Sequence, residues 1–266
     1  MRTQNYSKLL IILVISLFGT LSHGSDVAKE KRWAAQISDS LLVGEPVWLE
    51  GKSRFLGIYT PSQAAKTQGA AILLHGIGAH PDWPEVINPL RSELPDHGWA
   101  TLSIQMPILA NDAKIADYAP LFDEVPGRIK AAIAYLKKKN IRNVVIIAHS
   151  LGTAMASRYL ATTPKSPIRA YVAISMVENK PEVMSNLASL KKIRLPLLDI
   201  YGSRDQDNVL RTARMRKQIA ARIKNNGYTQ IKIEGADHFF TGHEAQLVKR
   251  IRGWLQRHAA GTEIRK

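Results

Sequence analysis

The stretch VVIIAHSLGTAMASRYL, residues 144–160, decides the fold of this 266-residue chain. It opens with the unbroken apolar run 144–148, which is typical of a strand buried on both faces of a parallel sheet. The segment 151–160 that follows predicts a helix, so the chain must turn sharply between the two, at Ser150. Ligands collect at the carboxyl ends of parallel strands, which makes this serine a candidate site residue.

The five residues around this turn, Ala148-His149-Ser150-Leu151-Gly152, match the nucleophile elbow, whose usual form is G-x-S-x-G. Small residues are needed two positions before and after the serine because so tight a turn brings both positions against neighbouring backbone. Here alanine replaces the first glycine, which adds one methyl group. The motif predicts a nucleophilic serine; the alternative is that Ser150 only caps the helix that follows it.

Other apolar runs alternate with helical segments along the rest of the chain. The expected strands are 70–74, 99–104, 144–148, 170–174, 195–201 and 231–233, and the expected helices are 85–94, 125–139, 151–160, 209–224 and 244–258. This alternation predicts an α/β domain over residues 45–266, with a mostly parallel, doubly wound sheet of about eight strands. Two short runs, 47–49 and 54–59, predict an antiparallel N-terminal hairpin, and residues 25–44 are expected to be a mobile lead-in or a short helix.

A serine hydroxyl needs a base to take its proton and a carboxylate to hold that base in place. In enzymes built around this turn, the acid and the histidine follow the serine along the chain in that order. Asp205 and His238 each follow a predicted strand, so both are expected at the same edge of the sheet as Ser150. Asp207 and Glu178 are alternative carboxylates.

Acyl transfer also requires two backbone N–H donors that face the developing oxyanion. The residue after the nucleophile, Leu151, is expected to supply one of them. The glycine-rich loop after the strand 70–74 is expected to supply the other from Ile77, with Gly76 or Gly78 as alternatives.

Four residues are expected to line the substrate pocket because they adjoin this loop or the serine: His75, Gly76, Trp83 and His149. Trp83 has an equally good alternative role in packing at the start of a helix. His149 points away from the nucleophile in an elbow of this kind, so it is expected to pack or to line the pocket wall rather than act as the base.

These elements together resemble the α/β-hydrolase superfamily over residues 45–258. The stretch HGIGAHPDWPEVINPLRSELPDHGWATLSIQMP, residues 75–107, is more particular and resembles an exported bacterial family of α/β-hydrolase-like proteins of unknown function. The resemblance implies an α/β-hydrolase fold with Ser150, Asp205 and His238 as its triad. It implies no substrate.

Residues 1–24 have the layout of a secretory signal peptide. A basic start precedes the apolar run 9–21, which is shorter than the roughly 20 residues that span a membrane. Ser22 and Gly24 then place small residues at the two positions that signal peptidase reads. We expect cleavage before Ser25 and a periplasmic or secreted product; the alternative is an uncleaved N-terminal membrane anchor.

Charge and composition limit the partners. The chain has 37 Lys and Arg against 22 Asp and Glu, a formal net charge of +15, which favours anionic partners. Export argues against nucleic acid, so an anionic lipid or polymer surface is the expected partner of the basic face; the alternative is that the charge only keeps a basic secreted protein in solution. There is no cysteine, and the pair His238 and His243 lacks an acidic cluster, so neither a metal nor another cofactor is expected.

The sequence therefore predicts a serine hydrolase that acts through an acyl-enzyme on a carboxylic ester or related acyl substrate, either a small molecule or a component of the envelope. The short segment 178–190 leaves room for only a small cap and predicts an open cleft. The alternative is a non-catalytic binding or scaffold protein of the cell envelope. Its basic face would include Arg211, Arg214 and Arg222, which fall on one side of a predicted helix.

Overall fold

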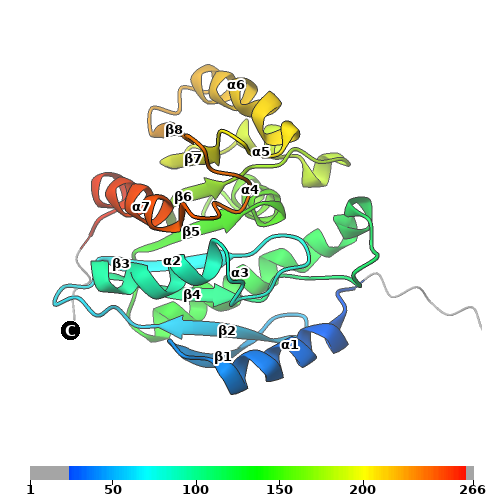
Figure 1. Cartoon of the computed structure of the whole chain (residues 1–266), viewed down its shortest axis with the longest axis vertical. Helices are drawn as coiled ribbons and strands as arrows, with labels where there is room; N and C mark the ends of the chain where they lie inside the picture. Colours follow the sequence, from blue (N-terminus) through cyan, green and yellow to red (C-terminus); the bar gives the residue numbers. More distant parts are fainter. Residues whose placement is uncertain (1–23, 262–266) are drawn as a thin grey trace, which may run out of the picture.

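The computed structural model describes residues 24–261, which fold around one eight-stranded sheet (Figure 1). The strands are β1 Glu45–Glu50, β2 Arg54–Thr60, β3 Gly69–Leu74, β4 Trp99–Ile104, β5 Val144–His149, β6 Ile168–Ile174, β7 Leu197–Gly202 and β8 Tyr228–Ile233. They lie in the order β1-β2-β4-β3-β5-β6-β7-β8. The pairings β1 with β2 and β2 with β4 are antiparallel and the others are parallel, which confirms the predicted sheet and N-terminal hairpin.

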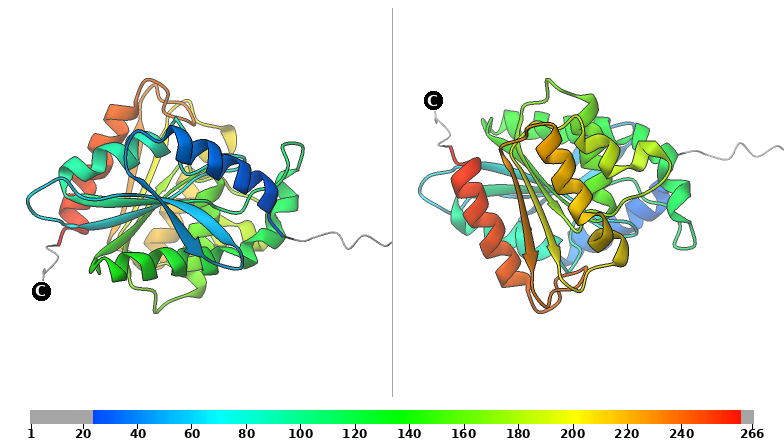
Figure 2. Two further views of the ribbon diagram at one scale, coloured as in Figure 1. Left: turned by 90° about the horizontal axis from the view of Figure 1, so that it is seen from below. Right: turned by 90° about the horizontal axis from the view of Figure 1, so that it is seen from above.

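Helices cover both faces of this sheet. They are α1 Val27–Ser40, α2 Ile87–Glu93, α3 Val125–Lys138, α4 Leu151–Thr162, α5 Asn186–Leu190, α6 Asp207–Arg222 and α7 Glu244–His258, with 3-10 helices η1 Leu94–His97, η2 Ile115–Asp123 and η3 Glu182–Met184. Figure 2 shows α6 and α7 on opposite sides of β7 and β8, and α1 and α3 on opposite sides of β1 and β2.

The alternation of side chains along the central strands explains why helices pack against both faces of the sheet. Successive side chains of a strand point to opposite faces, and every residue of β3 and β5 is buried. Ile72 and Ile146 belong to the core that holds α3 and α4, whereas Leu73 and Val145 belong to the core that holds α2 and α7. The unbroken apolar runs of the sequence therefore mark strands that bury both faces.

The segment before the hairpin is a helix rather than a mobile lead-in. α1 begins at its N-cap Asp26, whose side chain accepts a hydrogen bond from the backbone N–H of Lys29. Its residues Ala34 and Ile37 are buried against Leu56 of β2 and its neighbours, which makes α1 part of the folded domain. The predicted signal peptide lies, except for Gly24, outside the described residues. Within residues 24–261, none of the helices combines the length and the apolar character needed to span a membrane.

Element ends differ from those expected by up to three residues, and β8 and α6 are two examples. β8 begins at Tyr228, three residues before the apolar run that predicted it, because residues 228–230 pair with β7. The half-buried side chains of Tyr228 and Gln230 donate hydrogen bonds to Asp199. α6 begins at Asp207 instead of at residue 209, and Asp207 supplies a negative charge in its first turn. Hydrogen-bonded polar side chains are invisible to a pattern that tracks only hydrophobicity.

Candidate active site

Ser150 lies in a strained turn between β5 and α4. Its backbone has φ 53° and ψ −123°, a conformation that residues other than glycine rarely adopt. The turn is possible because its neighbours are small: a Cβ on Gly152 would lie 2.6 Å from the carbonyl oxygens of Leu74 and His75. The structure therefore has the geometry that the elbow motif predicts, and no hydrogen bond from the Ser150 side chain caps α4.

Three side chains that are far apart in sequence meet at this turn. The hydroxyl oxygen of Ser150 lies 3.0 Å from Nε2 of His238, and Nδ1 of His238 lies 2.6 Å from Oδ1 of Asp205. An ionised carboxylate only accepts hydrogen bonds, so Nδ1 carries the proton and the lone pair of Nε2 faces the serine hydroxyl. All three residues are at most 8% exposed. The structure thus brings together the predicted serine, acid and histidine.

Asp205 is held from several sides. Gln206 donates its backbone N–H to Oδ1 over 2.8 Å, and Ser175 donates its hydroxyl to Oδ2 over 2.5 Å. Burial raises the pKa of Asp205, but the hydrogen bonds from His238 and Ser175 outweigh it and hold that pKa below its usual value. The carboxylate therefore stays charged opposite the imidazole.

Ser175 is a site residue that the sequence reasoning missed. It directly follows β6, which lies between β5 and β7, so it shares the edge of the sheet where Ser150 and Asp205 lie. Its φ of 53° resembles that of Ser150. A polar residue directly after a buried strand, at the same edge as the serine, was the available signal.

Neither alternative carboxylate takes the place of Asp205. Asp207 is exposed in the first turn of α6. Glu178 accepts hydrogen bonds from the Ser185 hydroxyl and from the backbone N–H of Leu187, and so holds the start of α5. Asp205 is the one of the three whose carboxylate contacts His238 in this structure.

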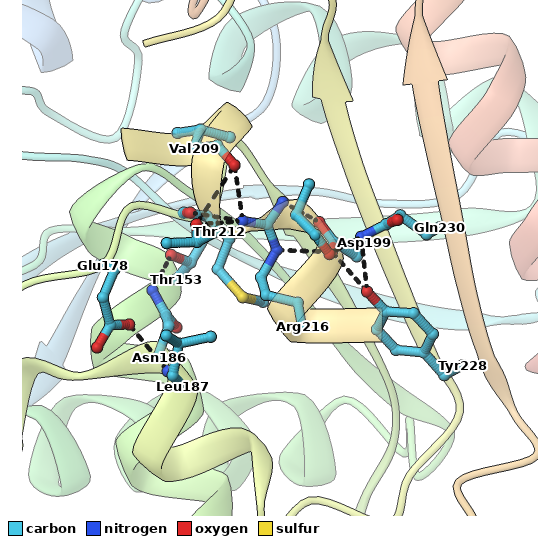
Figure 3. A network of polar contacts seen from close by, with 12 residues as sticks. Thr153, Glu178, Asn186, Leu187, Asp199, Val209, Thr212, Arg216, Tyr228 and Gln230 are labelled. Atoms are coloured by element: carbon cyan, nitrogen blue, oxygen red, sulfur yellow. Dashed lines mark hydrogen bonds and ion pairs between the residues drawn. The ribbon is translucent and has the colours of Figure 1, made fainter. Parts of the chain in front are cut away.

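The small cap is tied to the turn by a short chain of hydrogen bonds (Figure 3). Thr153 donates its hydroxyl to the carbonyl of Ser150 over 2.6 Å, and the side-chain amide of Asn186 in α5 donates to the Thr153 hydroxyl over 2.9 Å. Asn186 also donates to the carbonyl of Val177. The cap therefore supports the backbone of Ser150 through the Thr153 hydroxyl.

A second buried network beside the cap fixes α6 to the sheet (Figure 3). Arg216 of α6 donates to both carboxylate oxygens of Asp199, at 2.7 and 3.2 Å, and both residues are at most 1% exposed. Tyr228 and Gln230 of β8 donate to the same carboxylate. Asp205 lies in the loop between β7 and α6, so this network fixes the two elements that position Asp205.

The backbone N–H groups of Ile77 and Leu151 have no intramolecular acceptor within residues 24–261, and neither does that of Gly76. Leu151 is the first residue of α4, where N–H groups are unpaired and the helix dipole favours negative charge. Gly78 follows Ile77 with φ 65°. Gly76 lies against the serine, because a Cβ there would be 3.0 Å from the Cβ of Ser150. An oxyanion hole formed by Ile77 and Leu151 stays a prediction.

His75 lies in the interior rather than in a pocket wall. It is 1% exposed, and its Nε2 accepts the backbone N–H of Met106 over 2.9 Å. Nδ1–H therefore donates to the carbonyl of Gly76 over 2.9 Å. Burial lowers the pKa of His75 to about 3. This neutral ring fixes the backbone of the glycine loop, so its role differs from the expected contact with substrate.

His149 is also buried, at 3% exposure, and packs beside the catalytic candidates. Its Nε2–H donates to the carbonyl of His238 over 2.9 Å, and its ring lies 5.0 Å from that of His238 and 5.8 Å from that of Phe239. Burial and the adjacent His238 lower its pKa to about 4. Of its two expected roles, packing is the one that the structure supports.

Trp83 takes part in an edge-to-face cluster of rings. Its ring lies 5.2 Å from that of His80, which lies 5.2 Å from Trp33 of α1. Its carbonyl accepts the backbone N–H of Asn88 in α2. These contacts favour packing at the start of α2. His243 is at the N-cap position of α7, where its side chain makes no capping hydrogen bond. No group of three or more His, Asp or Glu side chains within residues 24–261 has metal-binding geometry.

Comparison with known families identifies the family of this chain. A family model described as "Protein of unknown function (DUF3530)" matches residues 25–121 and 119–257. The chain belongs to the DUF3530 family. Among curated proteins, the rat protein named "Putative protein-lysine deacylase ABHD14B" is 25% identical to this DUF3530 chain over 159 residues, which cover 60% of the chain and 72% of the rat protein. Its Pongo abelii counterpart is 26% identical over 161 residues, which cover 60% and 73%.

Solved structures resemble the DUF3530 chain at lower identity. An esterase of Pyrococcus furiosus has a TM-score of 0.67 at 18% identity and covers 84% of this chain and 96% of its own. Est1E of Butyrivibrio proteoclasticus, solved with ferulic acid, has a TM-score of 0.65 at 14% identity and covers 80% and 98%. A Xanthomonas campestris serine hydrolase described as lacking a lid scores 0.62 at 12% identity, covering 83% and 97%. This DUF3530 protein therefore has the α/β-hydrolase fold.

Proposed function

We propose that this protein is a serine hydrolase that cleaves a carboxylic ester or related acyl substrate with Ser150 as nucleophile, His238 as base and Asp205 as the acid that orients the base. The observation that carries the proposal is the unbroken chain of contacts, 3.0 Å from Ser150 to His238 and 2.6 Å from His238 to Asp205. Both distances are those of hydrogen bonds that can pass a proton.

In the first half of the reaction His238 takes the hydroxyl proton as the Ser150 oxygen attacks the acyl carbonyl carbon. The carbonyl oxygen gains the negative charge and accepts hydrogen bonds from the N–H groups of Ile77 and Leu151. His238 becomes an imidazolium beside the charged Asp205, and it returns the proton to the leaving group. The neutral His149 next to it avoids repulsion of this positive charge.

In the second half, water loses a proton to His238 and attacks the acyl-enzyme, and Ser150 leaves with that proton restored. Exposed apolar side chains flank the reacting groups: Ile77 in the glycine loop and Phe239 after His238 are both 42% exposed. An apolar rim fits an acyl chain better than a charged substrate. The names of the relatives, a deacylase and several esterases, support the same reaction class.

We further propose that the chain works outside the cytoplasm after its leader is removed. The basis is the layout of residues 1–24 described above. The substrate is then a small ester in the periplasm or medium, or an acyl group carried by an envelope component.

The test is labelling with a fluorophosphonate probe, followed by mapping of the modified peptide. Wild-type protein is expected to be labelled at Ser150 and to hydrolyse short-chain p-nitrophenyl esters, whereas Ser150→Ala loses both. Ser166→Ala is a matched control, because this hydroxyl contacts only Tyr159 near the protein surface. Equal ester turnover by wild type and Ser150→Ala would rule the proposal out.

A second candidate function is a non-catalytic envelope protein that binds an anionic surface. Its support is a surface hollow along α7 lined by Lys249, Arg250, Arg252 and Arg257. Salt-sensitive co-sedimentation with anionic vesicles, retained by Ser150→Ala, would favour this candidate. Sedimentation that depends on neither anionic lipid nor salt would dismiss it.

A further inference from the structure

A buried cluster of charges lies where α1 meets α3. Arg128 donates to the two carboxylate oxygens of Glu30 at 3.0 and 2.9 Å and to Oε2 of Glu124 at 3.2 Å. The three residues are at most 6% exposed. Two carboxylates thus share one guanidinium, a formal charge of −1 when both are ionised. A buried cluster with an uncompensated charge is unfavourable, so this cluster requires a second cation.

The backbone nitrogen of Ser25 lies where that cation is needed. It donates to Oε1 of Glu124 over 3.0 Å, and the Ser25 hydroxyl donates to Oε2 of the same carboxylate over 3.0 Å. Arg128 donates to the Ser25 hydroxyl over 3.1 Å. Ser25 is only 9% exposed, so its nitrogen is directed into the cluster and away from solvent.

We propose that the chain is cleaved between Gly24 and Ser25 and that the new α-ammonium group of Ser25 binds in this carboxylate site. The inference rests on the export proposed above, and it adds a defined mature N-terminus and a binding site for it. A signal peptidase supplies the catalyst and water the second reactant. The C–N bond of the peptide breaks, Gly24 gains the hydroxyl as a carboxylic acid, and the Ser25 nitrogen gains the proton to become an amine.

Ordinary acid–base chemistry completes the site. A free α-amino group has a pKa near 8, so it is an ammonium at neutral pH and holds a full positive charge. That charge brings the sum over Ser25, Glu30, Glu124 and Arg128 to zero. In the uncleaved chain the same nitrogen is a neutral amide. Burial is the main cause that raises the pKa of Glu30, and it outweighs the attraction of Arg128.

Neighbouring cations do not fill this role. Lys29, the closest lysine along the chain, is buried but directs its ammonium to the carbonyl of Leu109 and to the side chain of Asn111. Asp26 is engaged as the N-cap of α1. The charge balance of the cluster therefore depends on the state of the Ser25 nitrogen.

The docking site lies directly behind the glycine loop of the candidate active site. Arg128 donates to the carbonyl of Gln105 over 2.9 Å, and the Gln105 side chain lies 3.1 Å from Nε2 of His75. His75 in turn fixes the carbonyl of Gly76. Docking of the new N-terminus thus supports the backbone next to the proposed oxyanion hole.

The first experiment identifies the mature N-terminus. The full 266-residue chain is expressed with its leader in a bacterial host, the exported protein is purified, and its N-terminal peptide is identified by mass spectrometry. A first residue of Ser25 is expected. An uncleaved chain, or a mature chain that begins at another position, overturns the proposal.

The second experiment tests the docking. Residues 24–261 contain the complete sheet and its helices, so chains that begin at Ser25 or at Gly24 can be released from a removable fusion partner. The Ser25 chain is expected to melt about 5 °C higher or more, because the Gly24 chain buries an uncompensated charge. Glu124→Gln should abolish most of that difference. Glu182→Gln, at an exposed position, is the control for loss of one carboxylate.

A labelling measurement covers the case in which Glu124→Gln fails to fold. In the Ser25 chain the α-amine should react with an amine-directed ester at least tenfold more slowly than in the Gly24 chain. Equal melting temperatures together with equal labelling rates overturn the proposal. None of these readouts uses ester hydrolysis, so they stand apart from the test of catalysis.

Discussion

Ser175 donates a hydrogen bond to Asp205 over 2.5 Å, on the carboxylate oxygen opposite the one that contacts His238. The two oxygens of one carboxylate are thus divided between a hydroxyl that holds it and an imidazole that it orients. Ser175 follows β6 and Asp205 follows β7, so this contact exists only because those strands are neighbours.

Replacement of Ser175 by alanine tests this relationship. A hydrogen bond to a charged group contributes about 1.5–3 kcal/mol, so we expect kcat/KM for a p-nitrophenyl ester to fall about tenfold or more. The pKa of Asp205 should rise toward its usual value, because one of the bonds that lower it is lost. Activity should then be lost at a higher pH on acidification. If Ser175→Ala left the pH profile of activity unchanged, the positioning role of Ser175 would be contradicted. Ser166→Ala is the control, and its activity should equal that of the wild type.

The choice of acid can be tested with a matched pair. Asp205→Asn keeps the size of the side chain but removes the charge that selects the productive tautomer of His238, and we expect kcat to fall by about 10⁴. Asp207→Asn, two residues away and exposed, should leave kcat within about twofold. Steady-state kinetics of both variants show which of the two aspartates is the acid. Comparable losses in both would mean that Asp205 is not the acid.

The elbow turn makes a steric prediction. In Gly152→Ala the new methyl carbon would lie 2.6 Å from two carbonyl oxygens, closer than any stable contact, so α4 must shift away from β3. We expect loss of soluble protein or a melting temperature lower by about 5 °C or more. Gly253→Ala in α7 is the matched control, because its nearest atom lies 3.6 Å away and alanine favours the helix by about 1 kcal/mol. Equal melting temperatures for the two variants would refute the steric account.

The buried His149 predicts a pH dependence of stability. Its pKa is lowered from 6.5 to about 4 in the folded protein, so between these values the unfolded chain binds more protons than the folded one. The free energy of unfolding should therefore fall as the pH is lowered from 6.5 toward 4. In His149→Gln this slope, measured by urea denaturation at each pH, should become shallower. A slope identical to that of the wild type would be inconsistent with a buried neutral His149.

The buried ion pair between Arg216 and Asp199 predicts a large loss of stability when the arginine is removed. Arg216→Met leaves Asp199 buried without its cation, and we expect a loss of about 3 kcal/mol of unfolding free energy. Lys217→Met, the next residue on the same helix, is exposed and should change stability by about 0.5 kcal/mol or less. Denaturant midpoints of the two variants separate a structural pair from a general effect of lost charge.

The sequence alone determined the layers of this protein and the order of its candidate site residues along the chain. The short apolar run of β5, followed at once by a turn, predicted a strand buried on both faces. The small residues around Ser150 are required by the turn itself. The positions of Asp205 and His238 followed from their places after strands, since parallel strands end at one edge.

Only the tertiary structure decided which side chains touch. The contact of Ser175, the neutral ring of His75 and the cluster of Ser25, Glu30, Glu124 and Arg128 depend on residues up to 103 positions apart. Hydrophobic periodicity records whether a position is buried, but it carries no record of which partner satisfies a buried polar group. That partner is fixed by the order of strands and the packing of helices, and so it appears only once the chain is folded.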